Sequence, residues 1–457
     1  MEALPSNLLY YVNQVANYSK NNVKIQTLNQ TSLASNGSTQ LRLALPVNAI
    51  INMKSLSMHC DYSTTGVGDS TGSASDRVYA LIPRNGIASS LDRVTWSMGG
   101  ISTDNGVTPY HLVYNMLRNL KVSSDKYMSD EKVLNQSVIE SIDATEAYAI
   151  ASSGQSKHLV LNNFLGLTEM HPCYFDLSLV PECFMTVQCT DNSILPVQYQ
   201  GTTLGTFTAL NVNPNFSGTQ CNFAMNNIFF TADVISIGNG LYDALTQRLL
   251  SERGSLDVPY HQYQLFSQSQ SDAGGSIRGS VSTMSLNKVY AFHRNAAATA
   301  AGAPYDAYFT QQAPVLADGS TSYAYTQASD NFISKGIKDW QFTINNSPYP
   351  LWKPTPVEAF NFVVTGEDRT YSENRGGLVG SQKMWLDNAW CAPVQLNHDD
   401  EITRVTGMNL MSINSQIAFQ STTDGVAANN WARQVFLMTE QTSLIRVGEG
   451  RAVAVVA

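Results

Sequence analysis

The sequence is poor in charge. Only 14% of its 457 residues are Asp, Glu, Lys or Arg, against roughly 25% in an average soluble protein. Disordered tails, long charged helices and coiled coils need more charge than this, so none of them is expected as the main architecture. The 27 basic residues are outnumbered by 36 acidic ones, which gives a net charge of −9. A chain with so little basic surface is not expected to bind nucleic acid directly.

Long apolar runs and paired cysteines are missing as well. No window approaches the roughly 18 apolar residues that a membrane-spanning helix needs. Residues 1–5 do not begin the cationic and then apolar pattern of a secretory signal. The six cysteines form no C-x-x-C pair, so we expect buried free thiols, made in a reducing compartment.

Most of the chain has the pattern of β-strands. Apolar and polar residues alternate with period two in residues 23–28, 41–45 and 184–189, and residues 442–447 are β-branched and apolar. Such alternation is typical of strands that place one face on a core. Clusters of Gly, Ser, Asn, Asp and Pro separate the strands and predict turns.

Three segments have helical spacing instead: residues 6–20, 109–120 and 240–252. In the first, Ser6 is a candidate N-cap. The apolar residues of this segment form one stripe, which predicts an amphipathic N-terminal arm over residues 1–21. The stripe consists of Leu8, Leu9, Val12 and Val15.

The sequence also contains an internal repeat. Residues 92–100 and 338–346 alternate in the same way, and they end in Gly-Gly and Asn-Asn pairs that tolerate the positive φ of a tight hairpin. A Thr-Pro pair, typical of a helix start, follows each copy, at 108–109 and at 355–356. The strands are offset by 246 positions (94 to 340) and the Thr-Pro pairs by 247 (108 to 355). A duplicated domain explains both offsets; chance recurrence is the alternative, because alternating strands that end in turns are common in β proteins.

The duplication predicts an all-β chain of two tandem units. Each unit would hold about eight antiparallel strands and a short helix, for which a jelly-roll sandwich is the natural solution. The predicted boundaries are an arm at residues 1–21, a first roll at 22–237, a connecting helix and linker at 238–255, and a second roll at 256–457.

Four stretches carry a resemblance to a known family. They are residues 86–101, residues 158–161 with 174–181, residues 340–360, and residues 435–441 with 444–447. Their order and spacing, over residues 22–457, resemble the double jelly-roll major capsid proteins. Large DNA viruses of eukaryotes, virophages, polinton-like viruses and tailless icosahedral phages contain such proteins.

The resemblance implies a structural, non-catalytic protein of the virion shell. Three chains would form a pseudo-hexagonal homotrimer that tiles an icosahedral surface, with neighbouring trimers, penton proteins and minor capsid proteins as partners. The chain would be synthesised inside the host cell. The N-terminal arm would lie beneath the trimer, docked on its own subunit or a neighbouring trimer; the alternative sends it to a minor capsid protein or an internal membrane.

Three sets of residues have the composition of a chemical site. Residues 68–72 match G-x-S-x-G but lack the strand and helix of a nucleophile elbow. Residues 398–401, His-Asp-Asp-Glu, have carboxylates for a hard cation, yet a solvated turn is the favoured interpretation. Glu367 and Asp368 are neighbours and would point to opposite faces of a strand, unlike a glycosidase pair. We therefore expect no catalytic residue, metal or cofactor.

Two other functions stay open. A jelly-roll protein of this kind could bind glycans as a lectin or a viral spike. A β-sandwich glycosidase is the weaker alternative, because no catalytic pair of carboxylates is apparent in the sequence.

Overall fold

The computed structural model describes more than half of the chain, and every structural statement below concerns those residues. They are residues 18–35, 39–65, 77–80, 82–83, 86–103, 109–121, 156–162, 164–170, 172–191, 194, 197–201, 222–237, 240–295, 311–312, 322–326, 332–366, 385–386, 389–398, 406–411, 415–426 and 432–456.

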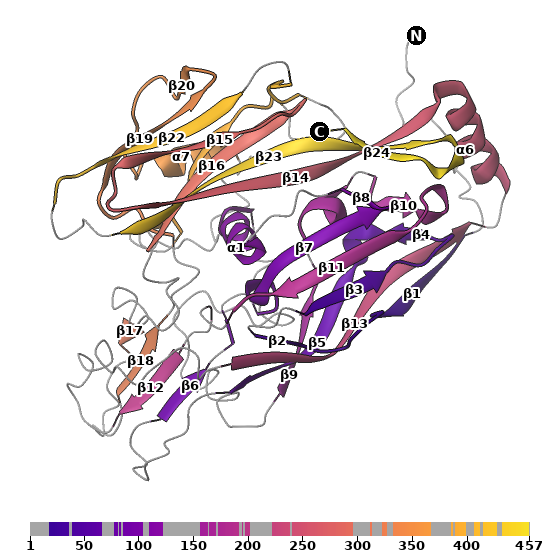
Figure 1. Cartoon of the computed structure of the whole chain (residues 1–457), viewed down its shortest axis with the longest axis horizontal. Helices are drawn as coiled ribbons and strands as arrows, with labels where there is room; N and C mark the ends of the chain where they lie inside the picture. Colours follow the sequence, from indigo (N-terminus) through magenta and orange to yellow (C-terminus); the bar gives the residue numbers. More distant parts are fainter. Residues whose placement is uncertain are drawn as a thin grey trace, which may run out of the picture.

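The first half of the chain forms a sandwich of two antiparallel sheets (Figure 1). The main strands of one sheet are, in spatial order, β1 (Tyr18–Gln26), β13 (Asn222–Ile237), β5 (Ser57–Thr65) and β9 (Ser156–Leu161). Those of the other are β3 (Gln40–Ala44), β11 (Cys183–Cys189), β7 (Leu91–Met98) and β8 (Ile101–Ser102). The short strands β2 (Leu33–Ala34), β4 (Ile50–Asn52) and β10 (Tyr174–Asp176) extend the first sheet.

The second half repeats this arrangement. One sheet contains β14 (Ser255–Gln270), β23 (Arg433–Gly448), β16 (Leu286–Asn295) and β21 (Ala392–Gln395), with β24 (Val453–Val456) paired to β23. The other contains β15 (Gly275–Ser280), β22 (Gln416–Thr423), β19 (Ile337–Ile344) and β20 (Ser347–Tyr349).

The two halves have the same connectivity. When the eight main strands of each half are numbered in chain order, the sheets read 1-8-3-6 and 2-7-4-5 in both halves. This is the strand order of a jelly roll, in which each sheet draws its strands from both ends of the chain segment. The predicted fold class, two tandem eight-stranded jelly rolls, is confirmed.

The internal repeat found in the sequence corresponds to β7 in the first roll and β19 in the second. β19 begins and ends 246 positions after β7. Each strand turns into a short partner through two residues of positive φ: Gly99 and Gly100 at 56° and 83°, Asn345 and Asn346 at 48° and 65°. Two left-handed residues in a row match the twist of the flanking strands, which explains the Gly-Gly and Asn-Asn pairs.

Among the described residues, three α-helices lie between the strands: α1 (Tyr110–Lys121), α6 (Gly240–Arg253) and α7 (Ala359–Gly366). The predictions of helices at 109–120 and 240–252 are confirmed. The prediction of a helix at 6–20 is wrong at its end, since Tyr18 to Lys20 belong to β1 and pair with β13. Lys20 also forms an ion pair with Asp233 at 2.7 Å, and sheet pairing over nine residues outweighs local helix propensity here.

A fifth sheet combines strands of the two rolls. Its order is β17 (Gln311–Gln312), β18 (Ser322–Thr326), β12 (Val197–Gly201) and β6 (Arg77–Ala80). The first two strands come from connections of the second roll and the last two from connections of the first, and the sheet lies apart from both sandwiches (Figure 1). The sequence does not predict this sheet, because β12 pairs with β6 and β18, both more than 100 residues away along the chain.

Each sandwich encloses a hydrophobic core. Trp96 lies fully buried in the first, and Trp340 and Trp390 in the second. The five described cysteines are free thiols, as predicted; four of them are buried, and Cys173 is half-buried. Burial raises the pKa of Cys183 and Cys189 to about 12.

The Asn-Asn turn yields a stability prediction. We expect Asn346→Val to lower the free energy of unfolding by about 1–3 kcal/mol, because a β-branched residue is strained at positive φ. Asn346→Gly, which copies the equivalent turn of the first roll, should leave it unchanged or slightly higher. Denaturant unfolding followed by Trp fluorescence measures both; equal stability of the two variants would contradict the assignment of this turn.

Candidate functional site

Where the two rolls meet, one sheet of the second roll is buried on both faces. Residues 286–294 of β16 and 435–443 of β23 are buried at every consecutive position. Successive strand residues point to opposite faces, so both faces of this sheet are covered by protein. In the first roll, residues 57–64 of the equivalent strand β5 alternate between buried and half-buried, as expected when only the inner face is covered. We call the contact that covers the second sheet the inter-roll seam.

Helix α1 fills part of this seam. Every side chain from Tyr110 to Arg118 is buried, a pattern typical of a helix enclosed on all sides. Tyr110 and Tyr114 join the core of the first roll. Leu112 and Met116 join the core of the second. α1 therefore links the two cores, and Figure 1 shows it between the sandwiches.

Two buried polar side chains of α1 have hydrogen-bond partners in the first roll. His111 Nδ1 lies 3.3 Å from the carbonyl oxygen of Leu91, and the Asn115 side chain donates to Ser89 Oγ at 3.2 Å. Burial, reinforced by the nearby Arg294 guanidinium, lowers the pKa of His111 to about 3. His111 is therefore neutral at physiological pH.

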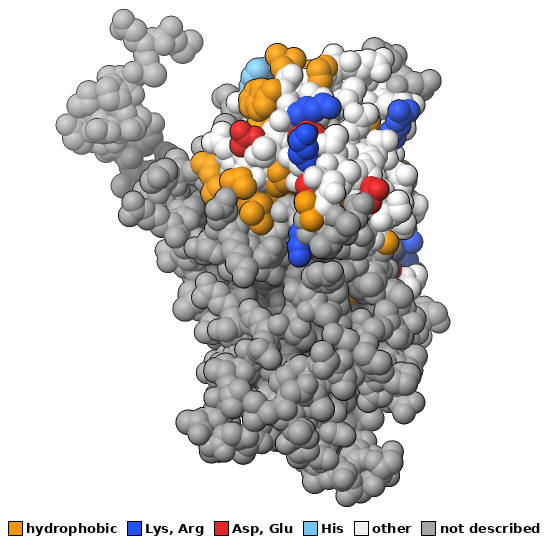
Figure 2. All heavy atoms as spheres, turned by 90° about the vertical axis from the view of Figure 1, so that its left-hand side faces the viewer, with side chains coloured by type: hydrophobic (Ala, Val, Ile, Leu, Met, Phe, Trp, Pro, Cys, Tyr) orange, Lys and Arg blue, Asp and Glu red, His pale blue; other side chains and the backbone are white. Residues whose placement is uncertain are grey.

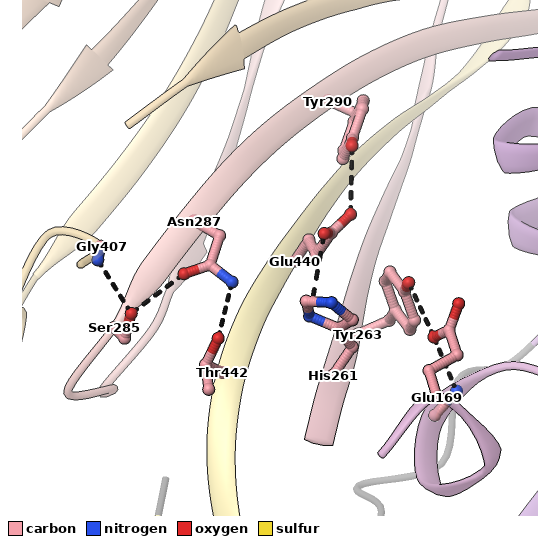
Figure 3. Close-up of polar contacts among 10 residues, drawn as sticks. Glu169, His261, Tyr263, Ser285, Asn287, Tyr290, Gly407, Glu440 and Thr442 are labelled. Carbon is pink, nitrogen blue, oxygen red and sulfur yellow. Dashed lines mark hydrogen bonds and ion pairs between the residues drawn. The ribbon is translucent and has the colours of Figure 1, made fainter. Parts of the chain in front are cut away.

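Strand β14 is bonded to the first roll at two points. Tyr260 donates a hydrogen bond to the carbonyl oxygen of Thr103. Tyr263 donates to Glu169 Oε2 at 2.9 Å, and the same oxygen accepts the backbone N–H of Gly166 at 3.1 Å (Figure 3). These bonds fix the second roll on loops of the first.

A buried carboxylate lies beside them. Glu440 of β23 is 3% exposed and accepts a hydrogen bond from Tyr290 at 3.1 Å (Figure 3). His261 Nδ1 lies 3.8 Å from its other oxygen, and Lys288 is its cross-strand neighbour. A buried charge is stable only when it is paired and hydrogen-bonded, and these neighbours supply that environment.

A second series of hydrogen bonds joins the loop at Gly407 to β16 and β23. Ser285 Oγ accepts the backbone N–H of Gly407 at 3.0 Å and donates to Asn287 at 2.9 Å. The Asn287 amide donates to Thr442 at 2.8 Å (Figure 3). Glu440, Glu169 and Asn287 are thus all hydrogen-bonded within the protein.

Nearly all of the residues singled out in the sequence lie outside the part of the chain that the structure describes. The arm residues Leu8, Leu9, Val12 and Val15, the 68–72 motif and the Glu367–Asp368 pair lie outside the described residues, as does all of the 398–401 cluster except His398. Within the described ranges, no group of three His, Cys, Asp or Glu residues is placed to hold a metal ion. In the same ranges, no helix is long and apolar enough to cross a membrane.

Sequence reasoning missed the seam, although a signal for it exists. Residues 435–438 read Val-Phe-Leu-Met and residues 289–292 read Val-Tyr-Ala-Phe. Unbroken apolar runs within strands indicate burial on both faces. The polar residues that follow, such as Glu440, have the appearance of a solvent face, and only the three-dimensional contact shows otherwise.

Comparison with solved structures identifies the fold. The chain superposes on the Faustovirus major capsid protein with a TM-score of 0.57 and 10% identity, covering 96% of this chain and 92% of that one. A quasi-atomic model of the PBCV-1 virus capsid gives 0.56 and 10%, with coverage of 98% and 99%. The Sputnik virophage structure gives 0.55 and 12%, with coverage of 100% and 92%. No protein-family model and no curated protein sequence matches the chain. The chain thus has the double jelly-roll fold of these capsid structures.

The buried His111 predicts a pH dependence of stability. Its pKa is about 3 in the folded chain and 6.5 in the unfolded chain, so the unfolded state binds more protons between these values. The stabilisation is complete above about pH 6.5 and is lost as the pH falls towards 3. Between pH 7 and pH 5, the wild type should lose about 2 kcal/mol more unfolding free energy than His111→Gln. Denaturant unfolding at both pH values measures this, and identical losses would show that His111 is not buried in the neutral form.

Proposed function

We propose that the chain is a major capsid protein: a structural, non-catalytic subunit of a virion shell. The observation that carries the proposal is the pair of jelly rolls with identical connectivity, joined by a buried seam. Over 96–100% of its length, the chain also shares its fold with subunits of viral capsids, one of them the Faustovirus major capsid protein. Rigid sandwiches suit a shell, because a lattice needs units of constant shape.

The proposed assembly is a homotrimer. The seam is a contact between unlike surfaces, and such a head-to-tail contact builds a closed ring when it is repeated with a suitable rotation. Each chain supplies two rolls of the same topology, so three chains would supply six and give a pseudo-hexagonal outline. Units of this outline would tile an icosahedral surface with neighbouring trimers, penton proteins and minor capsid proteins.

The proposed location is the virion, after synthesis inside the host cell. The arm with Leu8, Leu9, Val12 and Val15 would contact a neighbouring subunit or a minor capsid protein beneath the trimer, or an internal membrane. Direct contact with nucleic acid is not proposed, because the chain carries a net charge of −9 and lacks the cations that neutralise phosphates.

The native mass of the purified chain tests the assembly. Three copies of a 49.9-kDa chain would give a mass of about 150 kDa in light scattering after size exclusion. A closed ring of three chains should persist on dilution. A stable species of one chain at all concentrations would contradict the homotrimer.

A further inference from the structure

A fully buried histidine lies between the two sheets of the second roll. His293 of β16 has no exposed surface. Its ring meets that of Phe419, from β22 in the opposite sheet, at a centroid distance of 5.7 Å, and that of Trp390 at 5.6 Å. Within the described part of the chain, neither ring nitrogen has a hydrogen-bond partner. These surroundings do nothing to stabilise a second proton on the ring, so His293 is held in its neutral form.

A buried guanidinium lies on the same face of this sheet. His293 pairs with Val435 of β23, and Arg433, two residues before Val435, is therefore its diagonal neighbour across the strands. Lys and Arg side chains reach the surface on the side shown in Figure 2, whereas Arg433 is fully buried. Its guanidinium donates to the carbonyl oxygen of Lys335 at 3.0 Å. Burial lowers the pKa of Arg433 to about 10, which leaves it charged at physiological pH.

A proton on His293 would add a second positive charge to this core. Burial, and then the Arg433 charge, lower the pKa of His293 well below its usual 6.5. The carboxylates that face the guanidinium are those of Asp272, which is half-buried, and Asp424, which is exposed. They act on Arg433 from the surface side and leave the imidazole beneath without a counter-charge, so protonation of His293 opposes the folded packing.

The opposite face of β16 holds a similar pair. Arg294 follows His293 and points into the seam, where it donates to Gln434 at 2.9 Å. His111 of α1 lies near it, and burial, reinforced by Arg294 and weakly opposed by Asp191, keeps its pKa at about 3. Each face of β16 therefore carries a neutral histidine beside a guanidinium, one in the core of the second roll and one in the seam.

The first roll lacks such a group in its own core, although its topology is the same. In β5, the strand equivalent to β16, His59 lies half-buried on the outward face, and His158 of β9 is exposed. In the described part of the first sandwich, no histidine is buried between the two sheets. Acid should therefore act on the two rolls unequally.

We infer that the second roll is an acid-sensitive element, whose sheets open and release the seam on acidification while the first roll keeps its fold. The sign follows from proton linkage: an opened chain binds protons that the closed core rejects. The stabilisation is complete above about pH 6.5 and is lost as the pH falls below it. In the proposed shell, acid would thus loosen one half of each subunit. The inference concerns the single chain and does not depend on the proposed assembly.

Hydrogen–deuterium exchange followed by mass spectrometry tests this at pH 7 and pH 5, with rates expressed relative to those of the unfolded chain. In the wild type, protection of β16 and β22 should fall about 25-fold or more between these values, because the opened state gains a histidine of ordinary pKa. Protection of β5 and β13 should fall far less. In His293→Phe, which keeps an aromatic ring but cannot take up a proton, the fall in β16 and β22 should be about 25-fold smaller than in the wild type.

Two further variants make the test specific. His398 is an exposed histidine of the same roll, and His398→Phe should lose protection as the wild type does. His293→Leu is smaller than His293→Phe and repeats the measurement in case the larger ring strains the core; far-UV circular dichroism confirms that each variant is folded. Equal losses in the wild type and both His293 variants would overturn the role of His293. Equal losses in the two rolls would overturn selective opening, and neither result bears on the native mass that tests the homotrimer.

Discussion

The structure depends on the burial of both faces of one sheet. The β16–β23 pair packs its inner face on the core of the second roll and its outer face on α1 and the first roll. If the outer face of this sheet were exposed to solvent, the two rolls could move independently of each other. Here the covered outer face joins the two sandwiches, and the polar groups at that face must therefore find hydrogen-bond partners within the protein.

Charged and polar residues are tolerated in the seam because they have hydrogen-bond or ion-pair partners there. Glu440 has Tyr290 and His261 beside it, and Glu169 accepts bonds from Tyr263 and from its own turn. Removing one partner would leave a buried charge unpaired. The free-energy penalty of that unpaired charge exceeds the net stabilisation that the bond provides. The same constraint fits the low charge content of the chain, since few charges can be placed on surfaces that become buried.

Local patterns were sufficient to predict the fold. Period-two alternation, the Gly-Gly and Asn-Asn turns and the 246-residue offset are all encoded within short segments, and so are helices α1 and α6. The seam was not predictable in the same way, because whether a strand's outward face is wet or covered depends on a partner more than 100 residues away. The polar residues that follow the apolar run of β23, such as Glu440, have the pattern of a solvent face in the sequence and are buried in the structure.

The same long-range dependence explains the other differences. Tyr18 to Lys20 have helical spacing with the preceding residues, yet pairing with β13 extends β1 through them. The fifth sheet joins connections of both rolls and has no signature within any one of them. The arm residues Leu8, Leu9, Val12 and Val15 remain a prediction from the sequence.

Imaging of the purified particles by cryo-electron microscopy tests the central claim most directly. The account predicts class averages with six lobes of equal size around a three-fold axis. Particles with two lobes would contradict it.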